Sequence, residues 1–337
     1  MQWRGVEETV IYDDQGKADF RAHSAELVMR GGMLRKKDDE DFAGVTIEGE
    51  EVSYPTIGFS DRGFSQLCAR LEMPGKYVRG IPNHLSDQLF NHHLVDAAAN
   101  DAVYLLRNRR DQARAVLSSV YSIINNRRII EMANAIAVGN SKHSSGFAHT
   151  IKDFSLTDAG VWLKMVLPEL SRPDPIHRGS NVQVGVILGN SEVGERMATC
   201  EPFIFRQACM NDLIMVSGEA LQQRHVHLKE RELEARMAEA MGYAFQAGEE
   251  FMRKFIASRE IPVADPSAVL QRLVADLRLT KGQAESVDDA YKIEPESNVF
   301  GVISALTYAA QKMDPEDRVL VERGAGRYLA TSIRKVA

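Results

Sequence analysis

The sequence is poor in cysteine and contains no long apolar run. Its three cysteines, Cys68, Cys200 and Cys209, are too few for a disulfide scaffold in 337 residues, and their spacing matches no zinc-binding pattern. They fit a reducing compartment, so we expect a cytoplasmic protein. No stretch of about 18 apolar residues is present, so no membrane-spanning helix is expected. The N-terminal residues turn acidic without an apolar core, which is not the pattern of a signal peptide.

The sequence also lacks an excess of positive charge. Its formal net charge is −6, which excludes a uniformly basic protein that coats nucleic acid but leaves room for a local basic groove. The charge is unevenly distributed: residues 1–60 carry −6, residues 61–216 carry +2 and residues 217–337 carry −2. The acidic excess therefore belongs mainly to the N-terminal segment.

The familiar catalytic and cofactor motifs are absent as well. The sequence has no glycine-rich phosphate loop, no dinucleotide-binding G-x-G-x-x-G, no H-E-x-x-H and no paired C-x-x-C. Cys209 has no identifiable base partner, and a free cysteine in this situation is typically a small buried side chain. We therefore predict no catalytic residue, no metal ligand and no cofactor. Whether the protein is an enzyme stays open, with the balance towards a protein that is not one.

One short stretch is strongly basic. Residues 107–128 hold six arginines against the single acid Asp111, and clustered guanidinium groups suit phosphate because they donate paired hydrogen bonds. Two interpretations stand side by side: a solvated or structural set of arginines, and a surface for nucleic acid. On the second, Tyr104 or Tyr121 stacks on a base, and the alternative for Tyr121 is a core tyrosine with a satisfied hydroxyl. The predicted nucleic-acid contacts are Arg107, Arg109, Arg110, Arg114, Tyr121, Arg127 and Arg128.

The hydrophobic pattern predicts an α+β protein. A mixed sheet with packed helices is expected over about residues 45–216, followed by a mainly helical region with one long helix, placed at residues 218–259. The apolar stripe of that helix is typical of core packing. We divide the chain into an acidic segment (1–58), an α/β core domain (59–216) and a helical region packing on the core (217–337). Two apolar runs, 102–106 and 113–117, predict a β-hairpin whose tip or flank presents the arginines. Ser60 is predicted to cap the helix that follows it, and residues 182–188 predict a buried strand.

Three strings resemble the phage/plasmid-like proteins that carry a domain of unknown function. The first is Arg114-Ala115-Val116-Leu117-Ser118-Ser119-Val120-Tyr121, followed by Ile124-Asn125-Asn126. The second is Asn190-Ser191-Glu192-Val193-Gly194, followed by Arg206, Cys209 and Asn211. The third covers residues 298–311. The resemblance spans most of residues 59–330.

The resemblance implies a setting on phages, plasmids or integrative elements in a bacterial cytoplasm. The second string allows two interpretations: a turn whose side chains cap the backbone, or a loop that faces a ligand. The residues predicted for the ligand-facing alternative are Asn190, Ser191, Glu192, Arg206 and Asn211.

Our leading hypothesis is a DNA-binding protein of a mobile element. It binds single strands through a basic groove, supports annealing or recombination as a homo-oligomer, and has no membrane partner. Two alternatives remain: an enzyme acting on nucleic acid or a nucleotide, and an assembly protein whose long helix docks a partner.

Overall fold

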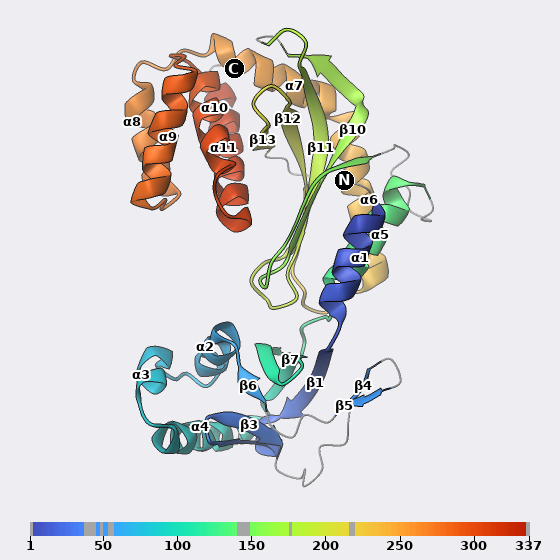
Figure 1. Cartoon of the computed structure of the whole chain (residues 1–337), viewed down its shortest axis with the longest axis vertical. Helices are drawn as coiled ribbons and strands as arrows, with labels where there is room; N and C mark the ends of the chain where they lie inside the picture. The colour runs from blue at the N-terminus through green and yellow to red at the C-terminus, as the bar shows by residue number, and fades with distance from the viewer. Residues whose placement is uncertain are drawn as a thin grey trace.

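The molecule has two lobes, which Figure 1 shows one above the other. The computed structural model describes residues 3–36, 45–47, 50–52, 57–139, 149–174, 177–215 and 220–334. It contains 48% helix and 28% strand, with mixed sheets followed by a helical C-terminal region, which confirms the α+β class. Within these residues, no helix is both long and apolar enough to cross a membrane.

The small lobe is built on a four-stranded sheet of order β1-β7-β8-β6. Helices α2, α3 and α4 accompany it (Figure 1). Its strands and helices are β1 (Lys17–His23), β6 (Gly58–Phe59), β7 (Val103–Arg109), β8 (Gln112–Ser118), α2 (Asp61–Arg70), α3 (Gly75–Gly80) and α4 (Asn83–Ala98). Short elements in the same part of the chain are η1 (Ser24–Glu26), β2 (Leu27–Arg30), β3 (Met33–Lys36), β4 (Val45–Ile47) and β5 (Glu50–Val52).

The predicted β-hairpin is present as the antiparallel pair β7 and β8. The turn falls at Arg110, whose φ of 56° places it in the left-handed region. From β1 onward the N-terminal segment is part of this lobe, because β1 pairs with β7 along its whole length, from Lys17 opposite Arg109 to His23 opposite Val103. Its first helix, α1 (Trp3–Asp14), packs on the large lobe instead. Main-chain hydrogen bonds of β1 therefore join the acidic N-terminal segment to the basic hairpin.

Helix α2 lies directly against the hairpin. The predicted cap at Ser60 is confirmed, since its Oγ accepts a hydrogen bond from the N–H of Gly63 at 3.0 Å. A Cβ at Gly63 would come within 2.4 Å of the Ala113 carbonyl oxygen of β8, so only glycine allows this close approach. The approach brings the first turn of α2, including Arg62, beside the arginines of the hairpin.

The large lobe is built on a meander of long antiparallel strands in the order β13-β12-β11-β10-β9, with β14 paired to β12. Helices cover both faces (Figure 1). Its strands are β9 (Thr150–Leu156), β10 (Val161–Pro173), β11 (Asn181–Asn190), β12 (Ala198–Arg206), β13 (Asn211–Ile214) and β14 (Leu221–Gln223). Its helices are α1 (Trp3–Asp14), α5 (Asn126–Ala137), α6 (Glu230–Gln246), α7 (Gly248–Ala257), η2 (Ser258–Glu260), α8 (Pro266–Asp276), α9 (Lys281–Ile293), α10 (Val299–Ala310) and α11 (Pro315–Arg334).

Strand β10 shows why the sheet needs cover on both faces. Val161, Leu163 and Met165 point into a core shared with α1, α5 and α6. The alternate residues Trp162 and Val166 point into a second core that includes Val319 of α11. Alternating side chains of a strand face opposite sides of the sheet, so both faces of this strand are buried.

Lys164 lies on the α11 side of β10 and is only 3% exposed. Its Nζ lies 2.7 Å from Asp212 of β13 and 2.8 Å from Glu322 of α11. Arg318 of α11 contacts the same two carboxylates at 2.8 and 2.9 Å. A buried ammonium group is tolerated only with such partners, so these ion pairs favour the packing of α11 on this face of the sheet.

The stretch 218–259 differs from the single long helix expected there. Its described residues contain β14, α6 and α7, and the two helices meet at Ala247. The longest helix is instead α11, with 20 residues. The predicted apolar stripe is buried, with Met241 and Phe251 among its most enclosed members. Because the sheet already covers this stripe, it is not a free surface for a partner.

Candidate nucleic-acid interface

An open pocket of about 640 Å³ lies where the small lobe meets the β9–β10 turn of the large lobe. Arg62 comes from α2, Arg109 and Arg114 from the hairpin strands, and Arg110 from the turn between them. The lining residues are Met33, Gly58, Phe59, Ser60, Arg62, Arg109, Arg110, Asp111, Gln112, Arg114 and Asp158. Four arginines against two aspartates make this pocket basic in a protein of net charge −6.

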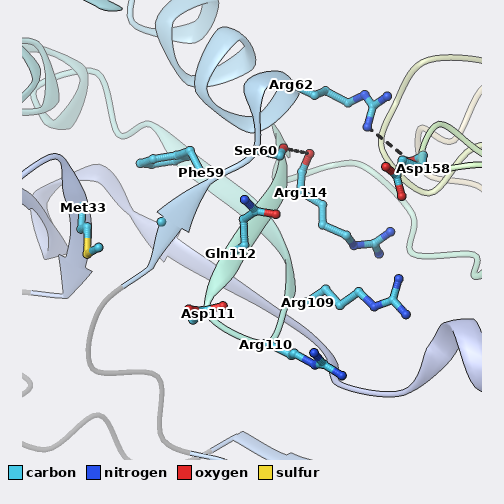
Figure 2. Close-up of a pocket in the computed structure, with 11 residues that line it drawn as sticks. Met33, Phe59, Ser60, Arg62, Arg109, Arg110, Asp111, Gln112, Arg114 and Asp158 are labelled. Carbon is cyan, nitrogen blue, oxygen red and sulfur yellow. Dashed lines mark hydrogen bonds between the residues drawn. The ribbon is translucent and has the colours of Figure 1, made fainter.

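The four arginines form a row. Figure 2 shows their side chains extending to the same side, with Arg62 at one end, then Arg114, Arg109 and Arg110. Phe59 and Met33 lie on the other side of the hairpin in this view, so the lining has a basic part and an apolar part. A row of guanidinium groups beside apolar surface matches the two components of a nucleic-acid strand, its phosphates and its bases.

The arginines of the row differ in how far the protein itself neutralises them. Arg110 has no ion-pair partner in the described part of the chain. Arg109 has only Asp13, at 3.3 Å. Arg62 pairs with Glu195 at 2.7 Å and donates to the Asp158 carbonyl at 3.3 Å. The Arg110 end of the row therefore has the most uncompensated positive charge.

Arg114 links the row to the protein interior. One terminal nitrogen donates to Glu192 Oε2 at 2.9 Å, and its side chain is 15% exposed. Its Nε is buried and has no hydrogen-bond partner among the described residues. Arg114 therefore belongs both to the pocket wall and to a buried cluster behind it.

That buried cluster is centred on Glu192, which is 2% exposed. Its Oε1 accepts from the backbone N–H of Asn126 at 2.7 Å and from Lys17 Nζ at 3.1 Å. Its Oε2 lies 2.9 Å from both Lys17 Nζ and Arg114. The main-chain carbonyl of Glu192 accepts from Arg107 at 3.0 Å. Because Lys17, Arg107 and Arg114 belong to the small lobe and Asn126 to the large one, the cluster joins the lobes.

Electrostatics fixes the charge state of this cluster. Burial alone would raise the pKa of Glu192, but Lys17, Arg114 and Arg107 outweigh it and lower the pKa to about 2. Burial likewise lowers the pKa of Arg107, and Asp19 and Glu192 reverse that effect so that its pKa lies above the usual value. Glu192 is thus a carboxylate with both oxygens occupied, and it has no free lone pair directed at the pocket.

Arg107 is placed in the interior rather than on the predicted phosphate-binding surface. Its exposure is 0%, and among the residues described it shares with Arg206 the place of the largest fully buried side chain. It pairs with Asp19 at 2.7 Å and donates to Asn125 Oδ1 at 2.6 Å. Sequence position alone could not separate it from Arg109, since both lie on β7. We therefore leave Arg107 out of the interface.

Tyr121 is also used internally. Its hydroxyl donates to the Ser191 carbonyl at 2.7 Å, and its ring stacks on His225 with a centroid separation of 5.0 Å. Burial raises the pKa of Tyr121, and it lowers the pKa of His225 to about 4, with the nearby charge of Arg107 acting in the same direction. This ring is not available for base stacking in this arrangement.

Arg127 and Arg128 lie on α5, away from the pocket lining. Both pair with Glu131, at 2.9 and 3.5 Å, and Arg128 also pairs with Glu230 of α6 at 2.8 Å. The six arginines of residues 107–128 are thus divided among a buried cluster, a pocket and a paired helix face. The solvated or structural interpretation describes three of them, and the interface retains Arg109, Arg110 and Arg114.

The predicted ligand-facing loop is buried as well. Asn190 and Ser191 are 0% exposed. Ser191 Oγ accepts from the N–H groups of Val193 and Glu195 at 3.3 and 3.1 Å, as the turn-capping alternative expects. Asn190 donates to Asn126 Oδ1 at 2.9 Å. The first two strings of the sequence therefore meet in three dimensions and form the junction between the lobes.

The remaining predicted loop residues contact the third string. Asn211 donates to the Ser304 carbonyl at 3.4 Å and accepts from Gln311 at 3.0 Å. Arg206 is 2% exposed, lies over the ring of Phe300 and pairs with Asp174 at 2.8 Å. These two residues lie at the other end of the long strands and take no part in the pocket.

Sequence reasoning missed Arg62, Asp158 and Lys17. Arg62 follows the correctly predicted Ser60 cap by two residues, but only the packing of α2 on β8 brings it to the arginine row. Lys17 lies in the acidic segment that the charge pattern set apart. A second overlooked group consists of His177, Cys209 and Glu294, whose ligand atoms lie within 4.8 Å of one another and which could hold a metal ion.

Together these features define a two-lobed α+β protein with an arginine-lined pocket between its lobes. In comparisons with known proteins, no family model, no curated protein and no solved structure matches the chain.

Proposed function

We propose that this protein binds single-stranded DNA in the pocket between its lobes, with Arg62, Arg109, Arg110 and Arg114 in contact with phosphates. The observation that carries the proposal is the row of four arginines on one side of an open pocket. Phosphate contacts supply most of the affinity in binding that does not depend on sequence. The incompletely paired Arg110 and Arg109 supply the largest share, because a ligand there displaces little internal pairing.

The concave shape favours a single strand over a duplex. Proteins that read duplex DNA insert a helix or a ribbon into a groove, so the recognition element protrudes. Here the arginines line a hollow between Ser60 of the small lobe and Asp158 of the large lobe. A flexible strand can enter such a hollow and place bases against Phe59 or Met33, whereas a stiff duplex cannot follow it.

The resemblance of the three strings to phage/plasmid-like proteins supports a DNA substrate on a mobile element. Annealing or recombination by a homo-oligomer is the form of this function that we expect. It is checked by light scattering for the oligomeric state and by the rate at which two complementary oligonucleotides anneal with and without the protein.

A fluorescence anisotropy titration tests the binding itself. A labelled oligonucleotide without secondary structure is titrated with the full chain at about 50 and 200 mM salt, with duplex and RNA of the same length as competitors. We expect tighter binding at low salt and a lower affinity for the duplex. No binding at low salt, or binding without salt dependence, would refute phosphate contact.

A pair of matched variants locates the site. Arg110→Asn removes a charge and keeps a residue that tolerates the left-handed backbone at φ 56°. Arg278 is exposed, has the same φ and lies in the C-terminal helical region, so Arg278→Asn changes the net charge by the same amount elsewhere. Only Arg110→Asn should weaken binding and reduce the salt slope, by about 0.7 for one lost phosphate contact on a single strand. Equal effects in both variants would mean that net charge alone drives binding.

The same preparation distinguishes DNA binding from the alternative, an enzyme acting on nucleic acid or a nucleotide. Incubation of the bound oligonucleotide with Mg²⁺ or Mn²⁺ leaves its length unchanged if the protein only binds. The Glu192 side chain, whose oxygens already accept from Lys17, Arg114 and Asn126, has no lone pair to spare for a metal ion in this structure.

A further inference from the structure

We propose that His177, Cys209 and Glu294 form a binding site for a zinc ion, with one coordination position left to water. The three residues come from three segments: the β10–β11 loop, the β12–β13 turn and the residue that follows α9. The site goes beyond the proposed DNA binding and does not depend on it. Because strands alternate in direction along the meander, these turns lie at the opposite end of the sheet from the β9–β10 turn that lines the arginine pocket.

The geometry is close to that of a loaded site. One ligand atom from each residue lies within 4.8 Å of the other two, and His177 Nε2 is 2.8 Å from Glu294 Oε1. Zinc bonds of about 2.0 to 2.3 Å at tetrahedral angles place ligand atoms about 3.3 to 3.6 Å apart. Shifts of about an ångström at partly exposed side chains bring the three donors to that separation.

Neighbouring residues already hold each ligand in position. Asp174 Oδ1 accepts from the backbone N–H of His177 at 3.1 Å, and Gln311 donates to the main-chain carbonyl of Cys209 at 3.2 Å. Arg206 donates to Glu294 Oε2 at 3.0 Å and to Oε1 at 3.5 Å, and Oε1 faces His177. The two backbone contacts fix the segments that carry His177 and Cys209, and Arg206 orients the Glu294 carboxylate as outer partners do in metal sites. The three residues are therefore positioned by a scaffold rather than by chance proximity on a surface.

The local charge complements a divalent cation. Asp174 and Glu294 contribute two negative charges, and Arg206 contributes one positive charge. When Cys209 is a thiolate, the set carries −2, and a zinc ion brings it to zero. Burial raises the pKa of the Cys209 thiol, an effect opposed by Arg206 and reinforced by Glu294 and Asp174.

The donor set selects the kind of metal. A thiolate and an imidazole favour zinc and other soft divalent ions over magnesium or calcium, which prefer oxygen. Zinc takes the lone pair of His177 Nε2, so in the zinc-bound site the ring proton lies on Nδ1, and bonds to the metal replace the contact between Nε2 and Glu294 Oε1. The Cys209 thiol releases one proton to solvent as the sulfur–zinc bond forms. Three protein ligands with His177 45% exposed leave the fourth position to water.

A titration of the metal-free full chain tests the site. The protein is treated with a chelator, exchanged into buffer and titrated with zinc by calorimetry, and bound zinc is counted by elemental analysis after gel filtration. We expect one zinc per chain and release of about one proton per zinc. Cobalt(II) in place of zinc should give the absorption of a thiolate-to-metal charge transfer.

Substitutions assign the ligands. His177→Ala, Cys209→Ser and Glu294→Gln should each weaken zinc binding more than about a hundredfold, since even the loss of an outer partner costs 10- to 100-fold. His84→Ala, an exposed histidine on α4, is the matched control and should bind as the parent does. Thermal melting without metal checks that the variants fold. Absence of stoichiometric zinc in the parent, or binding retained in all three variants, would overturn the site.

Discussion

The buried cluster around Glu192 and the open arginine pocket are adjacent and share Arg114, but they differ in how far the protein neutralises their positive charges. In the cluster, Arg107 and Lys17 are buried and fully engaged with carboxylates and carbonyls. In the pocket, Arg110 has no ion-pair partner within the described chain, and Arg109 has a single one. Arginines two and three positions apart on one hairpin thus serve structure in one case and remain available for a ligand in the other.

The difference shows that an arginine-rich string in a sequence is not by itself a binding surface. Arg107 lies two residues before the end of β7, at the point where the turn at Glu192 packs on the hairpin and accepts its hydrogen bond. The end of the hairpin that carries Arg109 and Arg110 is not covered by that turn and lines the open pocket. The comparison predicts large effects on folding from the cluster and effects on ligand binding from the pocket.

The largest effect is expected when the cluster loses its central charge. Glu192→Gln leaves Lys17 and Arg114 without their shared carboxylate, and breaking a buried ion pair costs about 3–5 kcal/mol. Urea unfolding measures the change in the free energy of unfolding. Glu195→Gln is the matched control, because its exposed pair with Arg62 should be worth less than about 1 kcal/mol. Similar losses in the two variants would contradict the structural role of the cluster.

The next effect is a loss of stability in acid. His225 titrates at about 4 in the folded protein and near its ordinary value of 6.5 in the unfolded chain. The unfolded state therefore gains the proton first, and stability falls as the pH drops from about 6.5 to 4, by up to about 3 kcal/mol. Glu192, with a pKa of about 2 against the usual 4.5, extends the loss below pH 4.5.

His225→Phe separates these two contributions. Neither ring nitrogen of His225 has a hydrogen-bond partner in the described structure, so phenylalanine keeps the stacking on Tyr121 and loses no hydrogen bond. Thermal melting followed from pH 7 to pH 4 should show a flatter profile for this variant. An unchanged profile would mean that other groups cause the acid sensitivity.

Substitutions of the pocket arginines should change oligonucleotide binding and leave the free energy of unfolding nearly unchanged. Arg109→Gln combined with Arg110→Asn is expected to lower the slope of log affinity against log salt by about 1.4, two phosphate contacts at about 0.7 each. The free energy of unfolding should change by less than about 1 kcal/mol, because Arg109 has only the partly exposed pair with Asp13. Anisotropy titrations and urea unfolding of the same preparation check both statements. A large loss of stability would place these arginines with the cluster instead.

The smallest effect is expected on α5. Arg128→Gln removes exposed pairs with Glu131 and Glu230, which are worth a few tenths of a kcal/mol each. Affinity for the oligonucleotide should match that of Arg278→Asn, since Arg128 does not line the pocket. A loss of affinity like that of Arg110→Asn would extend the interface to α5.

Local patterns explain how much of the fold was predictable. The hairpin of β7 and β8, the cap at Ser60 and strand β11 follow from apolar periodicity and capping chemistry, which act over a few residues. The division of residues 218–259 into β14, α6 and α7 was not predicted, because the apolar stripe runs through Ala247 without a proline, and the single Gly248 does not by itself indicate that a helix ends. The pocket was predicted in part, since Arg109, Arg110 and Arg114 share a hairpin whose register the sequence indicates.

The sequence by itself determined the α+β class, the hairpin and the gathering of arginines, because each depends on residues close together in the chain. Only the tertiary structure decided which arginines are buried. Arg107 and Arg109 occupy equivalent positions on β7, and the packing of the Glu192 turn, 83 or more residues further along the chain, distinguishes them. Burial of a charge depends on whether a distant partner neutralises it, and that partner is fixed only when the lobes come together.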